Sequence, residues 1–484
     1  MLNNPSSKMT NFRWIICSLL FFATTINYLD KQVLSMTIDF IRPEFHWSDF
    51  QYGLITGFFS LFYAVACLFA GRFMDWIGTR RGYFYAIGIW SIGACLHAFC
   101  GLATMGIVGI ESVEEMRALE AGSTMALAVA STSVWLFLLC RAILALGEGG
   151  NFPAAIKTTA EYFPKKDRAF ATSIFNAGSS IGAMASPLLI PSLAERFGWQ
   201  MAFIIIGALG FIWMFCWMQV YESPNKSKHV NKQELAYILQ DEGNAPAALE
   251  SQKEAEKEDK AIPLLKCLTY RQTWSFVLGK FFTDGVWWFY LYWAPSYFST
   301  CGYSMKTTLG KVLVFTLYTI VTIISFGGGY LPKYFVETRA MNPYKGRMLA
   351  MLIFAFFPLA ALFAQPLQDV SIWFPAILIG IAGAGHQAWS ANIFSTIGDM
   401  FPKSTVATIT GMGNMAGGIA AWAISIGAGL LFDYAEGQGD AFSFFGVCGK
   451  PAGYMIVFCC CAVTYLIAWC IMKALVPTYK PIKD

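Results

Sequence analysis

Twelve apolar runs in this 484-residue chain are each long enough to cross a lipid bilayer, and they constrain its fold more than any other feature. The runs are continuously apolar and do not alternate with polar residues, which indicates helices and not barrel strands. With 56% hydrophobic and 13% charged residues, the chain is too apolar for a soluble protein of this size. The sequence therefore predicts an all-α membrane protein with twelve transmembrane helices. The expected spans lie near residues 13–33, 50–72, 82–105, 126–155, 169–191, 198–221, 272–299, 308–332, 348–366, 371–396, 404–430 and 450–474.

Lys and Arg residues are unevenly distributed between the two sides of the predicted membrane. With both termini inside, about 25 of the 34 Lys and Arg residues fall in cytoplasmic segments, about 6 in external segments and about 3 within the membrane. Positive residues are retained on the cytoplasmic side, so we expect both termini in the cytoplasm. The first run lacks a small-residue cleavage site and is not expected to be a signal peptide. The formal charge of +4 reflects this retention and does not indicate a nucleic-acid partner.

One long polar stretch, 222–270, divides the chain into two predicted six-helix bundles, 1–221 and 271–484. Its charge-rich composition is typical of a linker, and we prefer a cytoplasmic tether to a regulatory domain. Within it, Asn231 is positioned to cap a short surface helix through Glu234.

The two bundles repeat each other. The segment EYFPKKDRA at 161–169 matches DMFPKSTVA at 399–407, at an offset of 238. A second match, between AGRFMD at 70–75 and GGYLPK at 328–333, has an offset of 258, so the first bundle holds about 20 extra residues. We place them at 106–125, as a helical elaboration on the external side. Repeats in transporters place the substrate path at their interface.

The loop GRFMDWIGTRRG, between the second and third spans, resembles the signature loop of the major facilitator superfamily. In that family the acidic and basic residues latch the cytoplasmic ends of helices together. Glycine permits the tight turn, and the carboxylate can interact with a helix N-terminus or with the basic pair. The predicted latch residues are Gly71, Asp75, Gly78, Arg80 and Arg81.

Ionisable side chains lie inside three of the predicted spans, where each costs several kcal/mol unless it is paired or lines a wet cavity. Arg141 and Glu148 are seven residues apart, which places them on one helix face about 10 Å apart along the axis. Each therefore needs a partner from another helix or from a ligand. Lys31, beside Asp30 in the first span, is the obvious candidate. In the seventh span, Lys280 and Asp284 are four residues apart and are expected to pair locally.

The repeat adds polar side chains at equivalent positions of the two bundles. At the offset of 238, Glu148 falls on His386 and Asn176 falls on Asn414, which predicts that these groups converge on one cavity. For His386, a hydrogen-bonded core role and a ligand role are equally supported. Gln387 suits sugar hydroxyls and interhelical hydrogen bonds equally well. The seventh span is rich in aromatics that could stack on a pyranose, and the sequence does not select among Trp287, Trp288, Tyr290 and Tyr292.

Over nearly its whole length outside 106–125 and 222–270, the chain resembles the anion:cation symporter branch of the major facilitator superfamily, and within it bacterial hexuronate transporters. The resemblance is carried by NYLDKQVLS, CRAILALGEGGNFPAAIKTTAEYFPKKDRA, FNAGSSIGAMASPL, GKFFTDGVWWFYLYWAPSYF and GHQAWSANIFSTIGDMFP. It implies twelve helices in two pseudo-symmetric six-helix halves, in the bacterial inner membrane.

By this resemblance the family's Asp-Arg pair falls on Asp30 and Lys31, and its fourth-helix Arg and Glu fall on Arg141 and Glu148. Tyr28 and Tyr63 match sugar-acid contact tyrosines of aldonate relatives. Two positions depart from the pattern. Lys31 stands where the family usually has Arg, which removes bidentate carboxylate recognition. Ser179 stands where aldonate relatives have Gln.

These residues predict a carrier that imports a hexuronate by proton symport. In this hypothesis Asp30 and Glu148 couple the proton. The predicted substrate contacts are Tyr28, Lys31, Tyr63, Arg141, Asn176, Ser179, Lys280, His386, Gln387 and Asn414. We expect a monomer in the lipid bilayer whose small-molecule partner is a hexuronate-like organic anion, with no cofactor except the coupling proton. No metal spacing, phosphate loop or nucleophile and base constellation indicates an enzyme. Two alternatives stay open: a sodium-coupled carrier or exchanger of another organic anion such as an aldonate or sialate, and a transporter-like sensor.

Overall fold

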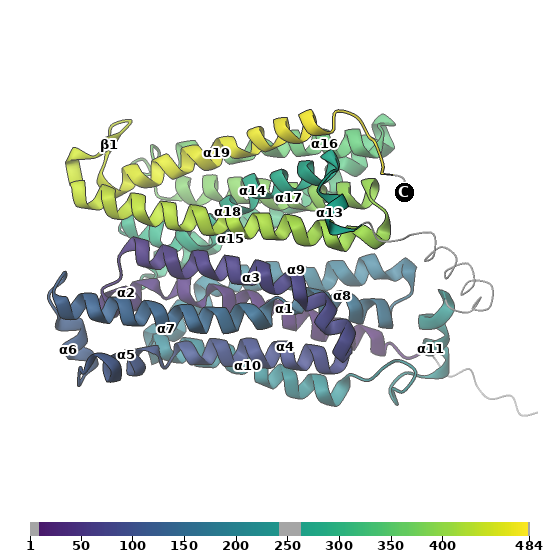
Figure 1. Ribbon diagram of the computed structural model, residues 1–484, viewed down its shortest axis with the longest axis horizontal. Coiled ribbons are helices and arrows are strands. Elements are labelled where there is room, and N and C mark those ends of the chain that lie inside the picture. The colour runs from purple at the N-terminus through teal and green to yellow at the C-terminus, as the bar shows by residue number, and fades with distance from the viewer. Residues whose placement is uncertain (1–8, 242–262, 483–484) are drawn as a thin grey trace, which may run out of the picture.

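The computed structural model describes residues 9–241 and 263–482 of the chain. Almost all of them are helical, and two bundles of helices lie side by side (Figure 1). The helices run roughly along the longest axis of the molecule in both bundles.

The first bundle contains six long helical segments, as the apolar runs predict. Two of them are interrupted: α4 is followed by α5 after a bend of 51°, and α7 is followed by α8 after Gly149 and Gly150. The short helix α2 follows α1 directly and contains Pro43. The helices of this bundle, long and short, are α1 (Phe12–Met36), α2 (Ile38–Phe45), α3 (Asp49–Ile77), α4 (Thr79–His97), α5 (Cys100–Val108), α6 (Val113–Ala118), α7 (Thr124–Glu148), α8 (Asn151–Tyr162), α9 (Lys165–Phe197) and α10 (Trp199–Val220).

The second bundle also contains six long segments. Here α16 continues as the 3₁₀-helix η2, which begins at the Phe357–Pro358 pair. The elements of this bundle, long and short, are α14 (Arg271–Thr300), α15 (Thr308–Arg339), α16 (Pro343–Ala355), η2 (Phe357–Phe363), α17 (Trp373–Met400), α18 (Lys403–Gln438), η3 (Gly439–Ala441), the short strands β1 (Ser443–Phe444) and β2 (Val447–Cys448), and α19 (Gly449–Leu475).

Nine helices among the described residues are long and apolar enough to span a membrane, or ten if the bent α4 and α5 pair is counted as one span. The α14 and α17 segments do not pass the same test. Both carry the polar and ionisable residues that the sequence singles out, including Lys280 and Asp284 on α14 and His386 on α17. Each of the twelve long helical segments that the structure describes, six in each bundle, overlaps one of the twelve predicted spans.

The internal repeat is visible at two helix starts. Pro164 and Pro402, which occupy matching places in the two repeated segments, are both extended residues that immediately precede a helix. Proline is compatible with a helix start because its missing N–H would be unpaired there in any case. The offset between the repeated segments therefore relates α9 to α18.

The predicted short helix in the linker is confirmed. Helix α11 (Lys232–Ile238) is capped by Asn231, whose side chain accepts a hydrogen bond from the amide of Glu234. The 3₁₀-helix η1 (Leu239–Asp241) follows it, and α13 (Leu264–Cys267) precedes α14. Glu234 is fully buried and in turn caps α1, because its carboxylate accepts hydrogen bonds from the amides of Phe12 and Arg13 at 3.0 and 3.1 Å. The carboxylate stabilises the positive end of a helix that has no acidic residue in its own first turn.

The predicted elaboration at 106–125 holds the short helix α6 between the end of α5 and the start of α7, and it is docked on α2. Arg117 of α6 donates to Glu44 at 2.8 Å, and the His46 ring bonds the carbonyl of Met116 at 2.9 Å. Glu44 is fully buried and also accepts from the Trp199 indole at 3.1 Å. These contacts fix α2 to the first bundle.

The two bundles meet most extensively along α3 and α18. Small residues permit this close approach: a side chain at Gly53 would overlap the carbonyl of Ser425, and one at Gly418 would overlap the methyl group of Ala64. Packing of this kind is typical of helix pairs in membranes, where small residues let backbones come together.

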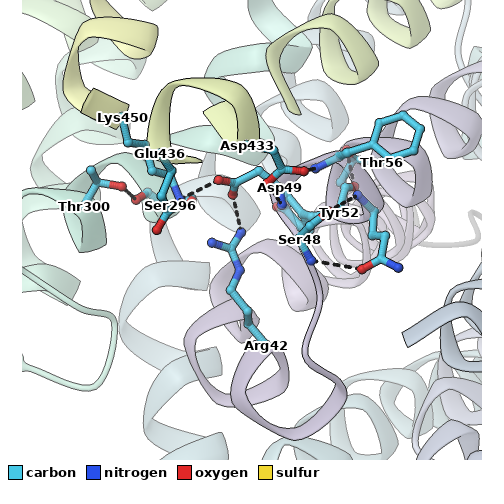
Figure 2. A network of polar contacts seen from close by, with 12 residues as sticks. Arg42, Ser48, Asp49, Tyr52, Thr56, Ser296, Thr300, Asp433, Glu436 and Lys450 are labelled. Carbon is cyan, nitrogen blue, oxygen red and sulfur yellow. Dashed lines mark hydrogen bonds and ion pairs between the residues drawn. The ribbon is translucent and has the colours of Figure 1, made fainter. Parts of the chain in front are cut away.

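Polar contacts between the bundles gather at the end that carries α2, α6 and the β1–β2 hairpin, opposite to α11 and the C-terminus (Figure 1). At their centre is Asp49, which is 2% exposed, accepts a hydrogen bond from Arg42 at 2.7 Å and forms an ion pair with Lys450 at 2.5 Å (Figure 2). The carboxylate of Asp433 accepts from the amides of Asp49 and Phe50 at 2.7 and 2.9 Å.

Two further groups of contacts strengthen this end. Asp39 of α2 reaches across to the second bundle and accepts from the hydroxyls of Ser299 and Ser304 and from the amide of Met305, at 2.6 to 2.8 Å. Lys311 of α15 pairs with Glu195 of α9 at 2.6 Å. We refer to the residues Asp39, Arg42, Asp49, Asp433 and Lys450 as the end network.

Candidate functional site

Lys31 lies in the middle of a buried polar cluster in the first bundle. Its ammonium nitrogen is 3.8 Å from a carboxylate oxygen of Glu148 and donates a hydrogen bond to the side-chain oxygen of Asn27 at 3.0 Å. The Lys31 and Glu148 side chains are 4% and 0% exposed. The predicted proximity of α1 and α7 charges is therefore confirmed. At this separation the pair attracts electrostatically but is too far apart for a hydrogen bond.

Arg141 is fully buried on the same helix as Glu148, and none of its three guanidinium nitrogens has a hydrogen-bond partner among the described residues. Its guanidinium carbon lies 4.9 Å from the centre of the Phe59 ring, which provides a cation–π contact but accepts no hydrogen bond. A buried cation without acceptors is costly, and a guanidinium is shaped to bind a carboxylate through two parallel hydrogen bonds.

Asp30 is 1% exposed, and in the described part of the chain the Trp90 indole approaches its carboxylate without reaching ordinary hydrogen-bond geometry. It lies within electrostatic range of both Arg141 and Glu148. The first bundle therefore holds two cations and two carboxylates that interact without being closely paired. Such a cluster is neutral when all four groups are ionised.

Aromatic rings surround the ammonium of Lys31. Its nitrogen lies 4.3 Å from the Tyr63 ring centre and 5.0 Å from that of Tyr28. Both tyrosines are half-buried, and their predicted contact with a sugar acid stays a prediction. The sequence reasoning missed Asn27 and Phe59. Asn27 was detectable in principle because it precedes Lys31 by four residues, which is one helical turn.

Lys280 and Asp284 form the local pair that their spacing predicts, with 2.6 Å between the ammonium nitrogen and a carboxylate oxygen. Both are largely buried in the second bundle. The Lys280 nitrogen also lies 4.4 Å from the centre of the Phe394 ring. Gly417 of α18 packs directly against Asp284, so that any side chain there would overlap its carboxylate.

His386 occupies a well-defined place in the core of the second bundle. Its Nδ1 atom is 2.8 Å from the hydroxyl of Tyr465, and its ring stacks on Trp287 with 5.4 Å between centres. These contacts satisfy the core role predicted for a buried histidine, and they do not test the ligand role.

The remaining predicted polar contacts are less enclosed. Asn414 and Gln387 are half-buried, Asn176 is exposed, and Ser179 donates to the carbonyl of Asn176 at 2.6 Å. The structure therefore brings Lys31, Asp30, Arg141 and Glu148 together. It gives no contact between Asn176 and Asn414 among the described side chains, and their predicted convergence on one cavity stays a prediction.

The loop predicted to be a latch lies at the end of the bundle that carries α11 (Figure 1). Gly78 has φ of 86°, a conformation that favours glycine, and it joins α3 to α4. Arg80 donates to the carbonyl of Met218 at 2.6 Å, which ties the loop to α10. Gly71 has open space beside it. The Asp75 side chain lies outside the described part of the structure. An open cavity of about 430 Å³ beside the loop is lined by Gly78, Arg80, Arg81, Glu161, Glu222, Lys226 and neighbouring residues.

Comparison with known proteins places this geometry in context. The family model described as Major Facilitator Superfamily matches residues 20–425. The chain is 29% identical over 431 residues to the hexuronate transporter of Escherichia coli strain K12, which covers 88% of this chain and 89% of that protein. It is 28% identical over 347 residues to the galacturonate transporter of Dickeya chrysanthemi, covering 72% and 89%.

Solved structures agree on the fold. A D-xylose-proton symporter superposes with a TM-score of 0.68 at 16% identity, covering 98% of this chain and 100% of that one. A bacterial homologue of the human lysosomal transporter Spinster gives a TM-score of 0.68 at 20% identity, covering 98% of both chains. At these identities the likeness establishes the arrangement of helices alone.

Proposed function

This chain belongs to the major facilitator superfamily, and we propose that it imports a hexuronate, such as glucuronate or galacturonate, by proton symport with alternating access of its two bundles. Two curated relatives that cover most of their own length carry the names hexuronate transporter and galacturonate transporter. Their names support a sugar acid as the substrate.

The observation that carries the proposal is the unpartnered guanidinium of Arg141, to which none of the described side chains offers an acceptor. A buried cation with no acceptor needs an anion, and a substrate carboxylate supplies the two oxygens that a guanidinium binds best. Lys31 lies on the same cluster and offers a second positive charge to the same carboxylate. In this scheme the tyrosines beside Lys31 contact the sugar ring and its hydroxyls.

Charge balance in the cluster supports coupling to a proton. Two cations and two carboxylates sum to zero, so a bound substrate anion leaves one negative charge that is costly in a buried site. Protonation of Glu148 removes that charge and releases Lys31 to hold the substrate. Once Glu148 loses its proton, it competes for the same cation and expels the anion. Asp30 is the second candidate for the same proton, because it is equally buried and lies beside Arg141.

Alternating access requires the two bundles to separate at one end and then at the other. The end network holds them together at the end opposite to α11. In the proposed orientation, which the charge bias of the loops supports, this is the external end, and the bundles are held together on the outside. Outward opening then requires Asp49 to separate from Lys450 and Asp433 to release the start of α3.

Uptake by purified protein in liposomes tests the proposal. We expect radiolabelled glucuronate to accumulate when an inward proton gradient is imposed, and unlabelled galacturonate to compete more strongly than galactonate or sialate. Accumulation driven by a sodium gradient alone, or only by exchange for internal anion, would replace proton symport with the corresponding mechanism. Binding of the sugar acid without any uptake would identify a sensor.

A further inference from the structure

The aromatic residues of α14 point to two different environments. Trp287 stacks on His386, and Tyr290 lies 6.5 Å from the ring of Phe458, so both face the interior of the second bundle. Trp288 and Tyr292, one turn apart and stacked with 5.5 Å between centres, face the first bundle instead, where they contact rings of α3. The structure thus separates four aromatics that the sequence could not distinguish.

Trp288 lies beside the ring that covers Lys31. Its ring centre is 5.9 Å from that of Tyr63 on α3, and the Tyr63 ring centre is 4.3 Å from the Lys31 ammonium. The Trp288 side chain is half-buried, so part of its surface stays open to a ligand. It is therefore a side chain of the second bundle next to a cation of the first.

Tyr292 occupies the corresponding place beside Arg141. Its ring centre is 6.3 Å from that of Phe59, the residue whose ring lies under the Arg141 guanidinium, and Tyr292 lies within electrostatic range of Arg141. The side chain is fully buried and its hydroxyl has no hydrogen-bond partner in the described chain. Tyr52 of α3 donates to the carbonyl of Tyr292 at 2.7 Å, which fixes this turn of α14 against the first bundle.

An unpartnered hydroxyl is not unique to Tyr292, because the Tyr290 hydroxyl also lacks a partner among the residues described. The difference is the neighbourhood. Tyr290 faces apolar rings and the Cys461 side chain, whereas Tyr292 lies beside the guanidinium of Arg141, which lacks an acceptor in the same part of the chain. An anion placed on that guanidinium would satisfy both the cation and the hydroxyl at once.

We propose that Trp288 and Tyr292 are the contacts that the second bundle makes with the substrate. This inference rests on the proposed function and deepens it. The Tyr292 hydroxyl donates a hydrogen bond to the carboxylate held by Arg141, and the Trp288 ring packs against the C–H face of the pyranose beside Lys31. Substrate then bridges the two bundles, so that binding favours the state in which they lie together.

The two residues would affect different parts of substrate recognition. Every sugar acid has the carboxylate that Tyr292 would contact, so Tyr292 contributes to affinity for all of them. A cyclic hexuronate offers a flat C–H face to an indole, but a linear aldonate does not. Trp288 therefore determines the preference for the ring form.

Equilibrium binding of radiolabelled glucuronate and galactonate to the purified full-length protein tests the assignment. For Tyr292→Phe we expect binding of both sugar acids to weaken by about tenfold or more, the range expected for a hydrogen bond to a charged group. For Trp288→Leu we expect glucuronate to bind about five- to tenfold more weakly while galactonate changes by less than about twofold. Trp288→Phe keeps a smaller ring and should lose less than Trp288→Leu, which guards against a folding defect.

Tyr290→Phe is the matched control. It removes a hydroxyl from the other side of the same helix that is equally buried and that also has no partner among the described residues. It should bind both sugar acids as the wild type does. Wild-type affinity in Tyr292→Phe and Trp288→Leu, or equal losses in Tyr290→Phe, would overturn the assignment while leaving the proposed function intact. If the wild-type protein binds neither sugar acid, the proposed function fails and the assignment fails with it.

Discussion

The ammonium nitrogen of Lys31 lies 3.8 Å from the carboxylate of Glu148, close enough to attract it but too far for a hydrogen bond. The lysine instead donates to Asn27 at 3.0 Å. A loosely paired charge can change partners at a lower cost than a tight ion pair. A carrier needs such a weak pair if the substrate anion is to replace Glu148 as the partner of Lys31 when Glu148 is protonated.

Glu148→Gln imitates the protonated carboxyl permanently. We expect this variant to keep exchange of internal for external glucuronate and to lose accumulation driven by a pH gradient, because the side chain no longer releases a proton. In wild-type proteoliposomes each unit of pH difference can support about tenfold accumulation for one proton per substrate, and the variant should not exceed equal concentrations. Retained accumulation would remove Glu148 from the coupling role.

Arg141→Lys keeps the positive charge but removes the planar guanidinium group, which can donate two parallel hydrogen bonds to a carboxylate. We expect glucuronate affinity to fall by about tenfold or more, since a charge-assisted hydrogen bond contributes about 1.5–3 kcal/mol. Lys31→Arg should bind glucuronate at least as tightly as the wild type, because it adds a guanidinium group where the family usually has Arg. Isothermal titration of the purified proteins measures both. Wild-type glucuronate affinity in both variants would show that only the positive charge matters at these positions.

The positions of the long helices and the buried charges were predictable because each depends on local sequence. Apolar runs fix where helices can cross a bilayer, and the spacing of Arg141 and Glu148 fixes the face they share. The Lys280–Asp284 pair and the Asn231 cap are likewise local, and both are present.

Contacts between distant segments were not predictable from the same reasoning. Asp49 is bound by Arg42 of α2 and Lys450 of α19, two helices that lie near opposite ends of the sequence. In the sequence these residues look like ordinary charges at helix ends. The choice of Trp288 over Trp287 also depends on how α14 is rotated, which is decided by packing against both bundles.

Asp49→Asn removes the negative charge shared by Arg42 and Lys450. We expect the bundles to separate more often at this end, so that the amides of Asp49 and Phe50, which donate to Asp433, exchange hydrogen about tenfold faster or more. Hydrogen exchange with mass spectrometry measures this on peptides spanning the start of α3.

Glu436→Gln is the control for that experiment, since Glu436 is an exposed partner of Lys450 and should change exchange little. Unchanged exchange in Asp49→Asn would show that the end network does not hold the bundles together.

Glu234→Ala removes the carboxylate that caps α1 and pairs with Arg13 at 3.1 Å. Because the pair is buried, the loss should destabilise the junction of α11 and α1 by about 3–5 kcal/mol. We expect a lower thermal unfolding temperature in detergent and faster proteolysis near the linker, with glucuronate affinity unchanged. If Glu234→Ala unfolds at the same temperature as the wild type, the contact between Glu234 of α11 and α1 does not stabilise the protein.

The most direct measurement of the central claim is an experimental structure of the protein with glucuronate bound. We predict that the carboxylate lies within about 3 Å of the Arg141 guanidinium and close to Lys31, with the sugar ring against Tyr63 and Trp288. A carboxylate bound elsewhere, with Arg141 still lacking any acceptor, would contradict the account.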